Sequence, residues 1–322
     1  MNDFTFSFLE EQIRLAKKIL ILTHINPDGD ALGSVMAMRS IILEMGKKEP
    51  AVFFTGVPSC NFKLEEKKII TSDTNYKNYD LLIILDTNNP RRTGVVTPEN
   101  LSELPKTIII DHHVKKNNGN NLDNIFCYIR PEATATCEII FDLLKDRGVE
   151  ISSNTAYYLL LGIFTDSGGF FHSNTTPTLL RKTKELLQKG VFFKNITQNA
   201  FKGKSVKILK FWGEKITTSR FHPKLKFIFG ILKISEITQK NIPYEELSGL
   251  VNLLNMCKEA YFSLLLTDEG NKIKGSLRSH EHKKIDVSQI SRFLGGGGHR
   301  LASGFEVYGK IVENKKKIFL ER

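Results

Sequence analysis

Short aliphatic runs alternate with longer amphipathic stretches along the first half of the chain. The aliphatic runs are typical of strands buried in a parallel sheet, and they lie at residues 19–23, 50–54, 81–85 and 107–110. The longer stretches carry apolar residues near helical spacing and predict helices over residues 31–45, 134–144 and 156–164. This alternation of strands and helices predicts an α/β domain with an open parallel sheet and helices on both faces.

The pattern changes after Gly190. Residues 191–215 are basic and helical in pattern, with no strand signal, and predict a helical linker. Strand-like runs dominate from residue 216 onward, at residues 225–234, 261–266, 272–278 and 305–308. We therefore predict a first domain over residues 1–190 and a smaller C-terminal α+β domain over residues 216–322.

Composition narrows the class of protein. The chain has 322 residues, of which 41% are hydrophobic and 25% charged, so it has enough apolar residues for a buried core. No apolar run is long enough to span a bilayer and no signal peptide is apparent, so we expect a cytoplasmic location with no membrane partner. The four cysteines lack a CxxC pair and predict reduced thiols: Cys60, Cys127, Cys137 and Cys257.

The chain is basic, with a formal net charge of +11. This charge fits the binding of a polyanion such as a nucleotide or a nucleic acid. It fits equally well a lysine-rich surface that promotes solubility, so the charge alone leaves both interpretations open.

Acidic and imidazole side chains follow the predicted strands, at the sheet edge where open α/β folds bind ligands. They come from four separate segments and comprise His24, Asp28, Asp30, Asp86, Asp111, His112, His113 and Asp166. Each alone has an ordinary explanation, such as a helix N-cap or a histidine in the core. Carboxylates crowded at one edge repel each other unless cations neutralise them, so the set together predicts a dinuclear metal site.

The mixture of carboxylates and imidazoles indicates the kind of metal. It suits borderline-hard divalent cations, and we expect two Mn²⁺ ions, with Fe²⁺, Co²⁺ or Mg²⁺ as substitutes. Two such ions roughly 3.5–4 Å apart activate a water molecule and clamp a phosphoryl group for in-line displacement. The predicted chemistry is therefore the hydrolysis of phosphate esters.

A run of four glycines precedes His299 in the second half of the chain. Glycines let backbone N–H groups approach an anion closely, although glycine runs are also common in flexible loops. A cation and an imidazole beside such a run predict a phosphate-binding wall. The candidate substrate-binding residues are Arg278, Gly296, Gly297, Gly298, His299 and Ser303.

These motifs resemble the DHH superfamily of phosphoesterases, which is named for the triplet at residues 111–113. Four N-terminal motifs occur in order as HINPDGD, LDTNN, DHH and TDSGG, and the LRS and GGGGHRLASG segments are similar to the DHH-associated C-terminal domain. The resemblance extends over roughly residues 19–305. It implies a DHH catalytic domain over residues 1–190, a linker over residues 191–215, a substrate-binding domain over residues 216–322, and an active site in the interdomain cleft.

The resemblance also implies roles for individual residues. By the family pattern His24, Asp28 and Asp86 bind one metal ion, and Asp30, Asp86, His112 and Asp166 bind the other, with Asp86 as the bridge. Asp86, Asp111 and His113 are the implied catalytic residues, with Asp111 behind the ligands and His113 near the scissile phosphate. Arg278 and His299 are implied to bind substrate phosphate, with backbone donors from the glycine run.

The size of the chain favours two-domain members similar to oligoribonucleases that also act as pAp phosphatases. The implied function is manganese-dependent hydrolysis of nanoRNA or pApA to mononucleotides, and of pAp to AMP. Open alternatives are a soluble cyclic di-AMP phosphodiesterase and a RecJ-like single-strand exonuclease; the complete ligand set argues against a non-enzymatic nucleic-acid-binding protein. We expect no long duplex partner, and the oligomeric state stays open, with a homodimer as one option.

Overall fold

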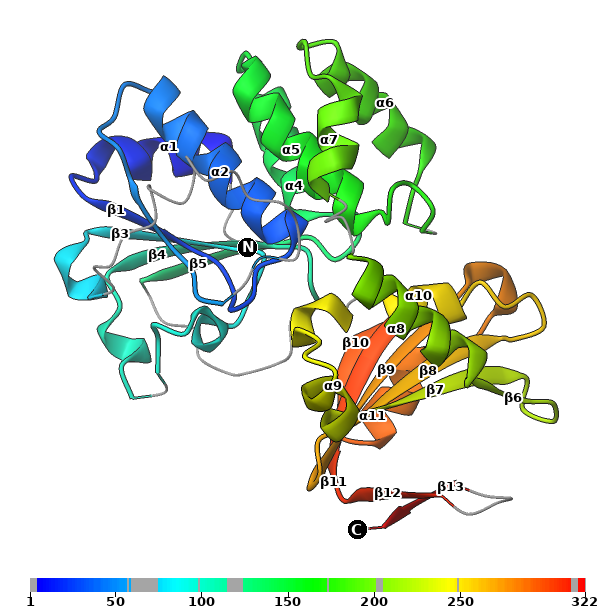
Figure 1. Ribbon diagram of the computed structural model, residues 1–322. Coiled ribbons are helices and arrows are strands. Elements are labelled where there is room, and N and C mark those ends of the chain that lie inside the picture. Colours follow the sequence, from blue (N-terminus) through cyan, green and yellow to red (C-terminus); the bar gives the residue numbers. More distant parts are fainter. Residues whose placement is uncertain are drawn as a thin grey trace. The chain divides into compact units, whose positions relative to one another are not determined.

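The computed structural model describes residues 5–56, 58, 75–97, 99–114, 124–172, 174–200, 205–247, 249–313 and 318–321. The chain divides into two compact units, Met1–Lys202 and Gly203–Arg322. Figure 1 shows a first unit rich in helices and a second unit built on a single larger sheet. Cys60, which we predict to be a reduced thiol, lies outside the described residues.

The first unit contains a five-stranded sheet with the strand order β2-β1-β3-β4-β5, and every neighbouring pair is parallel. The strands are β1 (Ile19–Leu22), β2 (Ala51–Phe53), β3 (Leu81–Leu85), β4 (Lys106–Asp111) and β5 (Ile125–Ile129). Four of them follow the predicted aliphatic runs. Strand β5 was not predicted, although its residues IFCYI form an apolar run; it lies at the sheet edge, where its residues are half-buried or exposed.

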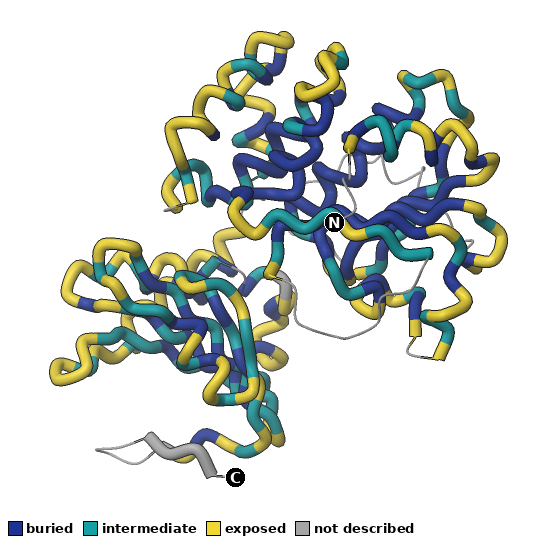
Figure 2. Tube along the Cα trace, turned by 180° about the vertical axis from the view of Figure 1, so that it is seen from behind, coloured by how far each residue is buried: buried dark blue, intermediate teal, exposed yellow. Residues whose placement is uncertain are grey.

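The described helices of this unit lie over one face of the sheet in layers. Helices α2 (Gly29–Glu44) and α4 (Thr136–Asp146) pack on the strands, and α1 (Phe6–Leu15) packs beside α4. Helix α5 (Ser153–Asp166) packs on α2 and α4, and α6 (Pro177–Leu187) and α7 (Phe193–Ala200) pack on α5. Their apolar residues form one buried core with Ile21, Ile83 and Ile110 of the strands. Figure 2 shows the buried positions gathered in these strands and in the helices packed on them.

The opposite face of the sheet has a smaller core. Leu22 and Leu82 pack there with Tyr76, Val96 and Leu104. These last three residues belong to segments that contain short 3-10 turns: η1 (Tyr76–Asn78), η2 (Pro90–Thr93) and η3 (Leu101–Glu103). The α/β class predicted for the first half of the chain is therefore confirmed. Among the described residues, however, α-helices pack on one face of the sheet and segments with 3-10 turns on the other.

Helices α2 and α5 approach each other closely because glycine occupies the points of contact. A Cβ added at Gly33 would lie 2.6 Å from the backbone oxygen of Tyr158, and one added at Gly162 would lie 2.6 Å from Oδ1 of Asp30. A larger residue at either position would push the helices apart. The close approach brings Asp30 on α2 near Asp166, the last residue of α5.

The stretch that we predict to be a helical linker contains two helices, one in each unit. Ile196 of α7 belongs to the core of the first unit. Helix α8 (Val206–Thr217) places Ile208, Phe211 and Trp212 in a core of the second unit. Residues 201–204 between the two helices lie outside the described residues.

The second unit contains a six-stranded sheet with the order β10-β11-β9-β8-β7-β6, in which only β7 and β8 pair in parallel. The strands are β6 (Arg220–His222), β7 (Phe227–Lys233), β8 (Phe262–Asp268), β9 (Lys272–Ser279), β10 (Gly297–His299) and β11 (Ala302–Tyr308), followed by the hairpin β12 (Lys310–Glu313) and β13 (Ile318–Glu321). This arrangement confirms the predicted α+β class.

The helices of the second unit pack on both faces of its sheet. On one face, Leu232 and Leu265 form a core with residues of α8, α9 (Ile234–Gln239) and α10 (Leu250–Leu254). On the other face, Leu277 and Phe305 pack with Val287 of α11 (Val287–Phe293). Two 3-10 turns, η4 (Tyr244–Leu247) and η5 (Glu281–Lys283), complete the unit. No helix in the described parts of either unit is long and apolar enough to cross a membrane.

Candidate metal centre and phosphate-binding face

Six acidic and imidazole side chains meet at the carboxyl edge of the parallel sheet. His24 Nε2 lies 3.5 Å from Asp86 Oδ2, and Asp28 completes a group whose ligand atoms lie within 4.8 Å of one another. His112 Nε2 lies 3.6 Å from Asp86 Oδ1, 4.0 Å from Asp30 Oδ2 and 3.5 Å from Asp166 Oδ2. The structure thus brings all six predicted metal ligands together, with Asp86 between the two groups.

Asp86 and Asp28 reach this cluster by different local means. Asp86 directly follows β3 with a φ of 61°, in the left-handed region that non-glycine residues seldom adopt. It does not cap a helix, because the next turn, η2, has Asn89 as its N-cap. Asp28 does cap one: its Oδ1 accepts hydrogen bonds from the N–H groups of Asp30 and Ala31 at the start of α2. Asp28 therefore caps α2 and at the same time contributes a carboxylate to the cluster.

The N-terminus of α4 holds two of the carboxylates in place. Its N-cap, Ala135, has no side-chain cap of its own. Instead, the N–H groups of Thr136 and Cys137 donate to the Asp30 carboxylate at 2.6 and 3.0 Å. The Thr136 hydroxyl donates to Asp86 Oδ1 at 3.0 Å, so one buried threonine contacts both carboxylates.

Sequence reasoning missed Thr136. It stands in an uncharged ATATC stretch with none of the residue types that mark a site. The available signal was indirect, because a helix that begins without a capping side chain of its own needs an acceptor from elsewhere.

The two buried histidines are oriented by backbone carbonyl groups. His24 Nδ1 lies 3.0 Å from the oxygen of Ile25, and His112 Nδ1 lies 3.4 Å from the oxygen of Ala133. A carbonyl can only accept, so Nδ1 carries a proton in each ring, and Nε2 is the nitrogen that lies near the carboxylates. Nε2 is therefore the nitrogen available to a metal ion.

Asp111 supports His113 from beneath. Its Oδ1 accepts hydrogen bonds from His113 Nδ1 at 2.7 Å and from the His113 backbone N–H at 3.1 Å. Burial acts to raise the pKa of Asp111, but the hydrogen bonds and charge of His113 outweigh it and hold that pKa below its ordinary value. Asp111 therefore stays ionised and fixes the imidazole, whose side chain is 36% exposed.

The electrostatics of the cluster call for a cation. Burial raises the pKa of Asp86 well above its ordinary value, and the nearby charges of Asp30, Asp28 and Asp166 raise it further. Asp111 adds a buried oxygen, Oδ2, that has no hydrogen-bond partner among the described residues. Crowded carboxylates with oriented imidazole nitrogens are the donor set of divalent metal ions, so the residues present fit such a centre.

In the second unit, two of the predicted phosphate-binding side chains share one face of the sheet. Arg278 on β9 and His299 on β10 both lie directly opposite Ala302 on β11, and directly opposed residues point to the same face. The next row contains Ser276, Gly304 and Gly297.

The structure does not bring Ser303 to this face. Its hydroxyl is buried on the other side, where it donates to the oxygen of Val287 at 2.8 Å and accepts from the Ser291 hydroxyl at 2.7 Å. The glycine run also has a packing role. A Cβ at Gly296 would lie 2.1 Å from the oxygen of Gly304, and one at Gly298 would lie 2.6 Å from the Cα of Ser303. Glycine is therefore required here for β10 to pair closely with β11.

The fold and this cluster define a class: a protein with a parallel-sheet unit that carries a cluster of acidic and histidine side chains suited to a divalent metal, followed by a mixed-sheet unit. Comparison with known families agrees. Residues 18–163 match the DHH family, N-terminal domain, and residues 226–322 match the DHHA1 domain. The chain belongs to the DHH superfamily, and the expected hydrolysis of phosphoric ester bonds is confirmed at the level of this family.

Several known proteins resemble the chain over nearly its whole length. A Thermus thermophilus protein named bifunctional oligoribonuclease and PAP phosphatase NrnA is 28% identical and aligns over 97% of this chain and 93% of its own length. A Bacillus subtilis protein of the same name is 25% identical over 92% of this chain and 91% of its own. The crystal structure of an exopolyphosphatase-related protein from Bacteroides fragilis aligns with a TM-score of 0.81 and 25% identity over 95% and 91% of the two chains.

Proposed function

We propose that this chain hydrolyses short nucleotides, converting nanoRNA or pApA to mononucleotides and pAp to AMP. The observation that carries the proposal is the meeting of all six predicted metal ligands at one sheet edge, with Asp86 between the two groups. The names of the relatives from Thermus thermophilus and Bacillus subtilis support the same substrates.

We propose two Mn²⁺ ions as the cofactor, held by His24, Asp28 and Asp86 on one side and by Asp30, Asp86, His112 and Asp166 on the other. When bound, a pair of such ions supplies Lewis-acid stabilisation of the phosphoryl group and lowers the pKa of water. The mixed oxygen and nitrogen donor set supports this choice of metal.

The chain's own residues position the reaction. Thr136 holds the Asp86 carboxylate, and the start of α4 holds that of Asp30, so both are oriented before substrate arrives. Asp111 fixes the His113 ring through Nδ1, and the imidazolium form of this partly exposed ring would donate a hydrogen bond from Nε2 to an oxygen of the scissile phosphate.

The second unit binds a further phosphate group of the substrate in this proposal. The guanidinium of Arg278 and the imidazole of His299 stand on one sheet face on either side of the small residue Ala302, which leaves room for an anion. A cytoplasmic location also remains our proposal, and the thiols of Cys127, Cys137 and Cys257, none of which forms a disulfide, support it.

The test is hydrolysis by metal-stripped protein, with and without added Mn²⁺, of pAp, pApA, a five-nucleotide RNA and cyclic di-AMP. We expect Mn²⁺-dependent release of AMP from pAp and pApA and slower turnover of cyclic di-AMP. Faster turnover of cyclic di-AMP than of pApA would assign the alternative phosphodiesterase activity. Lack of turnover of every substrate with each of Mn²⁺, Fe²⁺, Co²⁺ and Mg²⁺ would overturn the proposal.

A further inference from the structure

One half of a sheet face in the second unit lies open to solvent. We call this the open face; it consists of Lys272, Lys274, Ser276 and Arg278 on β9 and Ala302, Gly304, Glu306 and Tyr308 on β11, which lie opposite one another in the sheet. All eight residues are half-buried or exposed. The same face of β7 and β8 is instead covered, because Leu232 and Leu265 form a core with residues of α8, α9 and α10.

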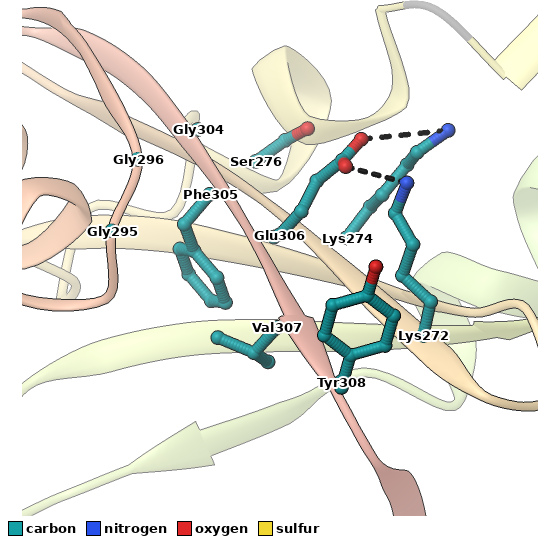
Figure 3. A pocket seen from close by; sticks show the side chains of 11 residues that line it. Lys272, Lys274, Ser276, Gly295, Gly296, Gly304, Phe305, Glu306, Val307 and Tyr308 are labelled. Carbon is teal, nitrogen blue, oxygen red and sulfur yellow. Dashed lines mark ion pairs between the residues drawn. The ribbon is translucent and has the colours of Figure 1, made fainter.

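A pocket of about 600 Å³ occupies the open face and the adjoining edge of β11. The side chains beneath the pocket are small where Ser276 lies opposite Gly304, and the backbone of Gly295 and Gly296 forms one side of it. Figure 3 shows Glu306, Lys274, Lys272 and Tyr308 around the part on the open face, and Phe305 and Val307 at the edge of β11. The volume lies within the usual range for small-molecule sites, about 300–1,000 Å³.

The charges in this pocket nearly cancel. The Glu306 carboxylate lies 2.5 Å from Lys272 Nζ and 3.8 Å from Lys274 Nζ, and Lys274 also lies 2.9 Å from Glu269. Two lysines are thus balanced by two glutamates. A phosphate gains little from such a site, whereas an uncharged group with hydrogen-bond donors and acceptors finds partners of both kinds.

The open face is longer than a single nucleotide. Arg278 and Lys272 are six residues apart on β9, which corresponds to about 20 Å at roughly 3.3 Å per residue. Tyr308, opposite Lys272, is 81% exposed at the far end from Arg278. An exposed aromatic ring is a platform on which any nucleobase stacks.

We propose that the open face binds the nucleosides of a single-stranded oligonucleotide that continues beyond the phosphate held by Arg278 and His299. The first nucleoside lies over Ser276 and Gly304, and a following base stacks on Tyr308. This inference rests on the proposed function and deepens it, because it makes the open face the part of the protein that distinguishes oligonucleotides from pAp.

The test measures binding without catalysis. The dissociation constants of a fluorescent five-nucleotide RNA and of pAp are determined for the full chain in EDTA. Tyr308→Ala should weaken RNA binding about tenfold and leave pAp binding unchanged, since loss of one base stack costs roughly that factor. Tyr308→Phe should retain binding, because the ring remains. Ser276→Leu, which fills the floor, should weaken RNA binding as well.

Phe221→Ala on β6, at the other edge of the sheet, is the matched control for loss of an exposed aromatic ring. An equal loss of pAp and RNA binding in Tyr308→Ala would indicate a general structural effect and overturn the inference. Unchanged RNA binding in Tyr308→Ala and Ser276→Leu would also overturn it, as would a wild-type chain that does not bind the RNA. Hydrolysis assays of the same proteins separate these outcomes from failure of the proposed function, which would appear as loss of all turnover in the wild type.

Discussion

The candidate metal centre of the first unit and the open face of the second unit differ in how their charges are arranged. Around Asp86 several carboxylates crowd together and are partly or fully buried, while Thr136 and the start of α4 hold Asp86 and Asp30 in place. On the open face the charges of Lys272 and Lys274 are partly exposed and are paired with those of Glu306 and Glu269. Accumulated buried charge is costly without a cation and suits a site of chemistry, whereas balanced exposed groups suit recognition of an uncharged surface.

The largest expected effect is at the centre of the first unit. Asp86→Ala removes the carboxylate shared by both ligand groups, and we expect hydrolysis of every substrate to fall by about a thousandfold or more, the equivalent of about 4 kcal/mol of lost stabilisation. Initial rates with pAp, pApA and a five-nucleotide RNA measure it. Asp146→Ala at the end of α4 removes an exposed carboxylate and is the control that should keep wild-type rates. Substantial activity in Asp86→Ala would contradict a shared ligand.

A smaller effect is expected where the protein orients these ligands. Thr136→Val keeps the shape of the side chain but removes the hydroxyl that donates to Asp86. Loss of a hydrogen bond to a metal ligand typically weakens metal binding about 10- to 100-fold. Titration calorimetry of the metal-stripped protein with Mn²⁺ measures this affinity directly, and Thr136→Ser should restore most of it. Equal Mn²⁺ affinities in Thr136→Val and the wild type would show that Thr136 does not help to orient the metal ligands.

The same sites show what the sequence could and could not predict. Strand ends follow from local aliphatic runs, and open parallel sheets bind ligands at the carboxyl edge, so His24, Asp86 and His112 could be grouped from sequence alone. The contacts of Thr136 could not, because residues 30, 86 and 136 meet only when α4 packs beside β3 and α2. Gly162 was missed for the same reason, since its role is to admit the Asp30 carboxylate.

In the second unit the sequence did not predict how the candidate phosphate-binding residues lie in the sheet. Arg278 and His299 share a face because both oppose Ala302, a register that no local pattern reveals. Ser303 was grouped with them by proximity in sequence, yet side chains alternate along a strand and its hydroxyl lies on the buried face.

Substitutions in the second unit should change substrate binding and leave the turnover rate little changed. Arg278→Ala removes a charged hydrogen-bond donor, so we expect the KM for pApA to rise about 10- to 100-fold with kcat little changed. The rise should shrink at high salt, because the lost interaction is ionic. His299→Ala should raise the KM in the same direction by a smaller factor. A fall in kcat with an unchanged KM for either variant would place that residue in the chemistry, where the comparison assigns only the first unit.

The smallest effect concerns stability in the absence of metal. The pKa of Asp86 is raised in the folded protein, so between the ordinary carboxyl pKa and that raised value the folded state keeps a proton that the unfolded state releases. The free energy of unfolding should therefore fall as pH rises through this window. Asp111 acts in the opposite sense: its pKa is lowered, so its contribution is present above the ordinary carboxyl pKa and is lost as pH falls below it.

Urea unfolding in EDTA between about pH 3 and pH 8 separates the two contributions. Asp86→Asn keeps the shape of the side chain but cannot ionise, so its stability should decline less with rising pH than that of the wild type, while the loss of the Asp111 contribution below the ordinary carboxyl pKa should occur in both proteins. Added Mn²⁺ should flatten the wild-type decline, because a cation offsets the repulsion that raises the Asp86 pKa. Parallel pH profiles for wild type and Asp86→Asn would mean that burial and the neighbouring carboxylates do not raise the Asp86 pKa. The first unit would then not differ from the second in crowding unbalanced charge.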